Sequence, residues 1–340
     1  MRPLGRGVVG WPLAVGIEMA RRGRSLGAIL GVLVWGAMVW GAPPQAARAE
    51  AVALTFDDLP TLSLTPSLAY DQVTSQDLLS GLRAHRFPAI GFVNEGKLEG
   101  GEKTQRTALL KAWLDAGMDL GNHSYSHPSL NSTPVEAYIA DVARGEPVTR
   151  SLLAARGRTL RWYRYPYLET GLTLETRRRF EGWLHAHGYR VAPVTMENAD
   201  WMFAYPYDEA VLHGDEAGAL RIRQAYLDYT ARVVPWYREA ALELLGRRPA
   251  FVFLLHASRL NADSVNGLAE ILKANRLRPS TLGVAMHDRA YAIADNYAGP
   301  DGDEWLSRWS LTLNKPLPWS SFPQPPADIA AAEERLDTSP

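Results

Sequence analysis

The 340-residue sequence contains no cysteine. This absence excludes disulfide bonds, thiolate zinc sites, iron–sulfur clusters and a cysteine nucleophile, so any metal ion has to be held by His, Asp or Glu. A strong net charge is also lacking, because 36 basic side chains face 37 acidic ones. A balanced charge gives no case for a nucleic-acid binder, and we expect no nucleic-acid partner. The hydrophobic content of 46% suffices for a packed core and excludes general disorder.

The first 49 residues differ in composition from the rest of the chain. They carry six arginines and one acid, and the apolar run 26–42 is followed by a small-x-small sequence that ends at Ala49. This order predicts a signal peptide over 1–49, cleaved before Glu50, with Met19 as an alternative start. The alternative is a membrane anchor, because about 17 apolar residues lie at the lower limit for spanning a bilayer. We therefore expect a periplasmic or secreted protein that meets a membrane only through an uncleaved signal segment.

From residue 50 onward, short apolar runs alternate with longer amphipathic stretches. The predicted strands are 52–56, 89–93, 118–120, 160–165, 191–194, 251–255 and 281–284. The predicted helices are 71–85, 104–116, 134–154, 173–187, 217–245 and 263–275. This alternation favours a parallel α/β sheet, closed or open. We assign 50–295 to one catalytic domain and 296–340, which is rich in Trp and Pro, to an irregular C-terminal extension.

Polar residues with catalytic potential follow the predicted strands. They are Asp57, Asp58, His123, His127, Arg164 and His256. In a parallel barrel the carboxyl ends of the strands share one face, so these side chains should converge. Each alone has an ordinary explanation, such as a helix cap, a surface ion pair or a core histidine. Their joint occurrence at strand ends favours a functional site.

The residue types in this set point to metal-assisted hydrolysis. Two neutral imidazoles and one carboxylate are a zinc-type ligand set that leaves a position open for water. A divalent ion in such a site suits hydrolysis of an amide or an ester. The second carboxylate can accept the proton of the water, and the additional histidine can protonate the leaving group. Adjacent side chains on an extended strand point to opposite sides, so we expect one Asp to bind the ion and the other to face the water.

Five short motifs occur in order along the chain. They are Thr55-Phe56-Asp57-Asp58, His123-Ser124-Tyr125-Ser126-His127-Pro128, Arg164-Tyr165-Pro166-Tyr167, Asp200-Trp201 and Leu254-Leu255-His256. Together they resemble the motifs of the polysaccharide deacetylase (NodB-like) family, carbohydrate esterase family 4. The resemblance covers residues 51–290 and implies an α/β fold, a deformed (β/α) barrel, with a metal-dependent deacetylase site.

The resemblance also implies which residues hold the metal and which one is the base. Asp57 would be the catalytic base, and Arg164 would orient it. Asp58, His123 and His127 would hold one divalent ion. Zinc is the expected metal, with Co, Ni or Mn as alternatives, because imidazole suits several of these ions.

The remaining motif residues would act on the substrate side. By the same resemblance the backbone N–H of Tyr167 would stabilise the oxyanion, and Asp200 would hold His256, the general acid. Trp201 and Leu254 would line a pocket for the acetyl methyl group. For Tyr167, Trp201 and Leu254, simple packing is an equally good interpretation.

Several positions depart from the family pattern. Leu59 and Leu168 stand where the family commonly has glycine, and Asn198 stands where it often has an acid. The segment 205–248 is long for one connection. We expect the two leucines to make the rim of the cavity bulkier. This change would leave the catalytic chemistry intact but would alter which substrates reach the site.

The resemblance implies removal of acetyl groups from an N-acetylated saccharide such as a chitin oligomer or peptidoglycan. An O-acetyl esterase, or a hydrolase of another small amide, would use the same residues. A non-catalytic saccharide-binding protein is the alternative of another class. The complete set of base, ligands and acid argues against it.

Overall fold

The computed structural model describes residues 50–65 and 67–337. The predicted signal peptide, 1–49, lies outside these residues, and its cleavage stays a prediction. Within the described ranges, no helix combines the length and the apolar composition that crossing a membrane requires.

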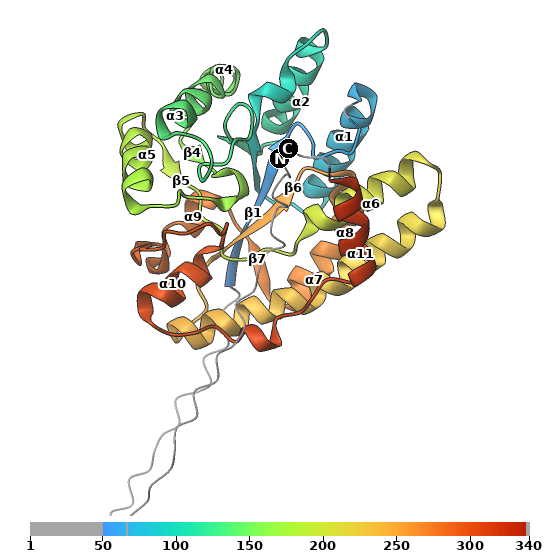
Figure 1. Cartoon of the computed structure of the whole chain (residues 1–340). Coiled ribbons are helices and arrows are strands. Elements are labelled where there is room, and N and C mark those ends of the chain that lie inside the picture. Colours follow the sequence, from blue (N-terminus) through green and yellow to red (C-terminus); the bar gives the residue numbers. More distant parts are fainter. Residues whose placement is uncertain (1–49, 66, 338–340) are drawn as a thin grey trace, which may run out of the picture. The chain divides into compact units, whose positions relative to one another are not determined.

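A sheet of seven parallel strands forms the centre of the fold (Figure 1). The strands are β1 (Glu50–Leu59), β2 (Ala89–Val93), β3 (Asp119–Asn122), β4 (Trp162–Tyr163), β5 (Arg190–Val191), β6 (Phe251–His256) and β7 (Leu277–Pro279). They pair in the order β5-β4-β3-β2-β1-β6, and β7 pairs with the start of β1. β1 is therefore an interior strand, and its consecutive residues Val52, Ala53 and Leu54 are all buried, as expected when both faces of a parallel sheet are covered.

The segment after β5 joins the two edges of the sheet. Ala192 N donates to Tyr163 O of β4 at 2.8 Å, whereas Leu254 N of β6 donates to Met196 O at 2.9 Å. Met196 also forms a parallel bridge with Phe253. The sheet is thus curled and closed by one irregular segment, and the predicted deformed (β/α) barrel is confirmed.

Helices connect consecutive strands and surround the sheet (Figure 1). They are α1 (Leu68–Ala84), α2 (Lys103–Asp115), α3 (Val135–Arg144), α4 (Pro147–Ala154), α5 (Leu174–Ala186), α6 (Asp200–Leu212), α7 (Glu216–Leu245), α8 (Arg259–Ala274), α9 (Leu282–Ala285), α10 (Trp305–Leu313) and α11 (Ala327–Leu336). Short helical turns occur at η1 (Glu95–Leu98), η2 (Pro166–Leu168), η3 (Arg289–Ala292) and η4 (Trp319–Ser321).

Two of the predicted elements need correction. The predicted strand 281–284 is the start of helix α9, because the Thr281 hydroxyl accepts a hydrogen bond from Val284 N at 3.3 Å and caps the helix. The predicted helix 134–154 is two helices, α3 and α4. The chain turns at Gly145, where a Cβ atom would lie 2.4 Å from the Ser124 carbonyl carbon, and Pro147 then begins α4 at a position that needs no backbone N–H.

The C-terminal extension is not irregular, which corrects the expectation for 296–340. It contains α10 and α11. Glu304 caps α10 by accepting hydrogen bonds from Leu306 N at 2.5 Å and Ser307 N at 3.1 Å, and Trp309 of this helix is fully buried. α11 contacts α6. The prolines of the extension lie at the breaks between these short helices, which hid the helical periodicity.

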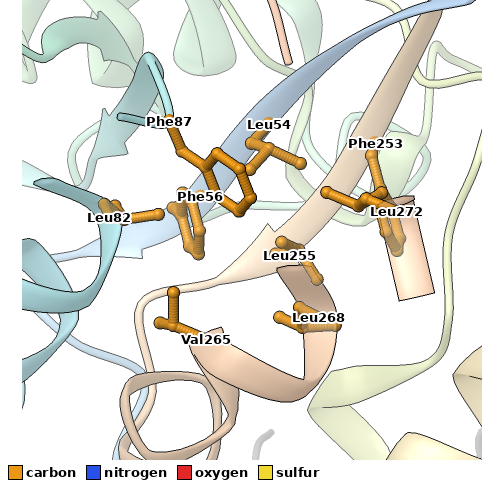
Figure 2. A pocket seen from close by; sticks show the side chains of 9 residues that line it. All are labelled: Leu54, Phe56, Leu82, Phe87, Phe253, Leu255, Val265, Leu268 and Leu272. Carbon is orange, nitrogen blue, oxygen red and sulfur yellow. The ribbon is translucent and has the colours of Figure 1, made fainter. Parts of the chain in front are cut away.

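An apolar cavity of about 10 Å³ lies in the core between β1, β6, α1 and α8 (Figure 2). Nine side chains line it, and all are Leu, Phe or Val: Leu54, Phe56, Leu82, Phe87, Phe253, Leu255, Val265, Leu268 and Leu272. Its volume is at the lower limit for one water molecule, and no polar side chain lines it. This cavity is a packing defect and carries no functional site.

Candidate active site

The two adjacent aspartates at the end of β1 face the same cluster of histidines. Asp58 has a φ of 68°, and the β1–β2 pairing shifts register between Phe56 and Leu59. Asp57 Oδ2 and Asp58 Oδ1 consequently lie 3.8 and 3.7 Å from the same atom, His123 Nε2. The expectation that the two side chains point to opposite sides is wrong, because the backbone is not extended at Asp58.

Asp58, His123 and His127 form a group that could hold a metal ion, with ligand atoms all within 4.8 Å of one another. Asp58 Oδ1 is 3.6 Å from His127 Nε2, and it is buried without a hydrogen-bond partner among the described residues. An orphaned carboxylate oxygen facing two imidazole nitrogens is the arrangement that a cation would satisfy. The donor set therefore fits a divalent metal.

The ring nitrogens of His123 are oriented for this role. Its Nδ1 lies 2.9 Å from Arg164 O, and because a carbonyl only accepts, Nδ1 carries the proton and Nε2 keeps its lone pair. Burial lowers the pKa of His123 well below the usual value and also lowers the pKa of His127. Burial alone would raise the pKa of Asp58, but the charge of Lys97 brings this pKa below its usual range. The group thus combines neutral imidazoles with an ionised carboxylate.

Asp57 is held by Arg164 and keeps one oxygen available. Arg164 Nη1 lies 3.5 Å from Asp57 Oδ2, and Arg164 Nη2 donates to Thr55 Oγ1 at 3.0 Å. Arg164 is fully buried. Asp57 Oδ1 is buried without a partner among the described residues. Burial, opposed by Arg164 and His256, raises the pKa of Asp57 to about 6.

His256 at the end of β6 is paired with Asp200 at the start of α6. His256 Nδ1 lies 2.8 Å from Asp200 Oδ1, and His256 N donates to Asp200 Oδ2 at 2.6 Å. Asn261 Nδ2 donates to Asp200 Oδ2 at 2.5 Å and fixes the carboxylate further. Burial alone would lower the pKa of His256, but Asp200 raises it to about 9. The imidazole is therefore protonated near neutral pH and leaves Nε2 as the free donor.

The three predicted substrate-side residues differ in their surroundings. Tyr167, with a φ of 56°, places its ring edge-on to His127 with centroids 4.4 Å apart, and its side chain is 43% exposed. Leu254 is buried in β6 two residues before His256, and the half-buried Trp201 follows Asp200. A pocket role for these three residues stays a prediction.

Lys97 belongs to this site, and the sequence analysis missed it. Its Nζ lies 3.6 Å from Asp58 Oδ2 and donates to Asp58 O at 3.1 Å and to Thr61 O at 3.2 Å. Lys97 lies in η1, directly after β2. The rule that strand ends converge could have identified it, because it follows a predicted strand as the other site residues do.

The two leucines at usual glycine positions do not form the rim of the cavity. Leu59 is fully buried and contacts Gly91, where a Cβ atom would lie 2.4 Å from Leu59 Cδ2. Leu168 is also buried, with a φ of 54°. Asn198 is buried and donates to Tyr226 Oη and Thr230 Oγ1, each at 2.9 Å. The expected bulkier rim is wrong, because the side chains of both leucines are buried.

Comparison with known proteins identifies the segment that carries most of these residues. Residues 45–191 match the family model described as polysaccharide deacetylase. This segment is a polysaccharide deacetylase domain by its family match. The family predicted from the motifs is thus confirmed. Asp57, Arg164 and the three candidate metal ligands lie inside the matched polysaccharide deacetylase segment, whereas Asp200 and His256 lie beyond it and join the site through geometry alone.

The curated relatives carry related names. Over 150 residues the chain is 27% identical to a peptidoglycan-N-acetylglucosamine deacetylase of Bacillus cereus, covering 44% of this chain and 46% of the relative. Over 87 residues it is 34% identical to the peptidoglycan-N-acetylglucosamine deacetylase PgdA of Listeria monocytogenes, covering 26% of this chain and 16% of the relative. The chain therefore spans less than half the length of the curated relatives it matches.

Solved structures of polysaccharide deacetylases and related esterases are also similar. A family 4 carbohydrate esterase from Streptomyces lividans is 23% identical with a TM-score of 0.46, covering 70% of this chain and 97% of that chain. The chitin deacetylase of Colletotrichum lindemuthianum is 20% identical with a TM-score of 0.47, covering 70% and 88%. Similarity at this level carries no argument about activity.

Proposed function

We propose that this chain is a metal-dependent hydrolase that removes acetyl groups from an N-acetylated saccharide, such as a chitin oligomer or peptidoglycan. One observation carries the proposal. A candidate metal triad, a carboxylate with a free buried oxygen and a carboxylate-bound histidine occupy one end of one barrel. This set contains every group that hydrolysis of an acetamide requires.

Asp58, His123 and His127 would hold the metal, and zinc is the ion that two imidazoles and one carboxylate suit best. When bound, a divalent ion would polarise the acetyl carbonyl and lower the pKa of a water molecule. Lys97 holds Asp58 Oδ2 and its backbone oxygen, which leaves Asp58 Oδ1 facing the two imidazoles.

Asp57 would accept the proton of the attacking water. Arg164 fixes its Oδ2, so Oδ1 is the oxygen left to receive that proton. With a pKa raised to about 6, the carboxylate is mostly ionised at neutral pH yet more basic than an ordinary aspartate. These properties suit a general base.

His256 would act as the general acid. Its proton on Nε2 would pass to the saccharide nitrogen as the C–N bond breaks, which gives acetate and a free amine. Asp200 keeps the imidazole protonated and oriented through Nδ1. The backbone N–H of Tyr167 would stabilise the oxyanion in the transition state, as the family resemblance implies.

The names of the relatives support a cell-wall saccharide as the substrate. Those from Bacillus cereus and Listeria monocytogenes are named for N-acetylglucosamine in peptidoglycan. Acetate release should therefore be measured on N-acetylated chito-oligosaccharides, peptidoglycan and acetyl-xylan, with the metal added and with a chelator present. We expect metal-dependent acetate from the first or second substrate.

The other outcomes of this assay separate the alternatives. Acetate from acetyl-xylan alone would make the protein an O-acetyl esterase. Saccharide binding without acetate release from any substrate would contradict the proposal and indicate a binding protein.

We also propose that the protein acts in the periplasm or outside the cell, because 1–49 has the sequence of a signal peptide. N-terminal sequencing of protein from the native host should find a mature chain that begins at or near Glu50. An intact N-terminal segment in the membrane fraction would contradict this prediction and favour an anchor.

A further inference from the structure

The loop that carries Tyr167 has an unfavourable backbone conformation. Tyr167 and Leu168 are consecutive residues with φ values of 56° and 54°. This left-handed region is uncommon for residues other than glycine, and two bulky side chains in succession are disfavoured there. A contact from outside the loop is therefore needed to hold it.

Arg308 of α10 provides such a contact. The side chain is fully buried, and its Nη2 donates to Leu168 O at 2.6 Å while Nη1 donates to Thr170 Oγ1 at 2.8 Å. Within the extension, Nε donates to Asp303 O at 2.8 Å. Nη1 also lies 3.3 Å from Oδ2 of Asp295, the residue just before the extension. One guanidinium thus ties the loop to the C-terminal extension with its rigid fork of donors.

The chain before α10 also contacts the loop closely. At Gly302 a Cβ atom would lie 1.8 Å from Tyr167 O, so only glycine allows this approach. Trp305 N donates to Val194 O of the barrel at 2.7 Å, and Asn131 Nδ2 donates to Pro300 O at 2.9 Å. Segment 300–308 is therefore fixed on the barrel and on the loop together.

We infer that segment 300–308 positions the Tyr167 loop for catalysis, with Arg308 and Gly302 holding Tyr167 and Leu168 in a conformation that glycine would adopt unaided. The inference rests on the proposed function, because it requires the Tyr167 backbone to face the reacting acetyl group. Arg308 acts through the loop and is a positioning residue. The C-terminal extension, which lies beyond the matched family segment, is thereby part of the catalytic apparatus.

Arg308→Gln should lower kcat about 10- to 100-fold, because a small displacement of a catalytic group costs this much. KM should change by about twofold or less, and metal content should stay the same, because the lost interaction matters only in the transition state. Arg177→Gln is the matched control. Arg177 is also buried and pairs with the same Asp295 at 2.8 Å, but its other partner is Glu181 rather than the loop. This control should lower thermal stability without lowering kcat.

A second substitution that restores kcat distinguishes positioning of the Tyr167 loop from general stabilisation of the protein by Arg308. Adding Leu168→Gly to Arg308→Gln should restore most of the lost kcat, because glycine reaches a positive φ without support. If Arg308→Gln does not fold, Gly302→Ala serves instead, because it displaces the Tyr167 carbonyl and leaves Arg308 in place. The inference would be overturned if Arg308→Gln and Gly302→Ala both kept the wild-type kcat. It would also be overturned if Arg308→Gln and Arg177→Gln lowered kcat equally and Leu168→Gly restored none of the loss.

Hydrogen–deuterium exchange of residues 166–170 separates this inference from the proposed function. Faster exchange in Arg308→Gln than in wild type and Arg177→Gln is expected whether or not the wild type releases acetate. Unchanged exchange would overturn the inference. An inactive wild-type protein with the expected exchange would instead count against the proposed function.

Discussion

Asp57→Asn should lower kcat by about a hundredfold or more, the usual loss for a positioned general base, while the protein keeps its metal. The carboxamide has nearly the shape of the carboxylate but cannot accept the proton of the attacking water. The substitution removes no candidate ligand, because Asp58, His123 and His127 form the metal group without Asp57. Metal analysis beside acetate-release kinetics on the purified variant gives the measurement.

Asp208→Asn is the control for the loss of a buried carboxylate. Asp208 is also fully buried, but it accepts hydrogen bonds from Tyr70 Oη at 2.8 Å and Leu64 N at 2.9 Å. Its variant should keep kcat. An Asp57→Asn protein as active as wild type would overturn the assigned base even if the metal were confirmed.

His127→Ala should lower both the metal content and the activity. His127 Nε2 is one of the three candidate ligand atoms, and loss of a ligand should weaken metal binding by more than the roughly 10- to 100-fold that loss of a ligand's hydrogen-bond partner costs. Titration of the apo protein with zinc, followed by calorimetry, measures the affinity directly and does not depend on activity. Asp58→Asn should weaken metal binding in the same way.

His187→Ala is the matched control for this substitution. His187 is exposed at the end of α5, where its ring contacts the Trp183 carbonyl, and its removal should leave the metal affinity unchanged. A His127→Ala protein with full metal content and turnover would mean that the ligand assignment is wrong.

The parts of the fold that the sequence predicted well are those where one local signal dominates. β1 and β6 are continuous apolar runs, and α7 has a sustained helical period, so their positions were correct. At 281–284 a short apolar run was equally compatible with a strand, and the Thr281 cap decided for a helix. In the extension, periodicity over nine or ten residues was too short to show α10 and α11.

The part of the candidate site that lies at the ends of parallel strands was predictable from the sequence. The convergence of Asp58, His123 and His256 required only that the strands be parallel. The orientation of the aspartate pair was not predictable, because it depends on the φ of one residue, Asp58. Arg308 was equally hidden, since its partner is a backbone carbonyl far away in the sequence and carries no sequence signal.

Because the barrel is closed by the segment after β5, the residues of the site come from distant parts of the sequence. Asp58, His123 and His127 follow the first strands, whereas His256 reaches this group only when β6 pairs with β1. The hydrogen bond from Thr55 Oγ1 to Phe253 O spans 198 positions, and pairing at such separation raises contact order and slows folding. All candidate metal ligands therefore precede β6 in the chain, and the proton donor joins them only through the β1–β6 pairing that places Asp57 beside His256.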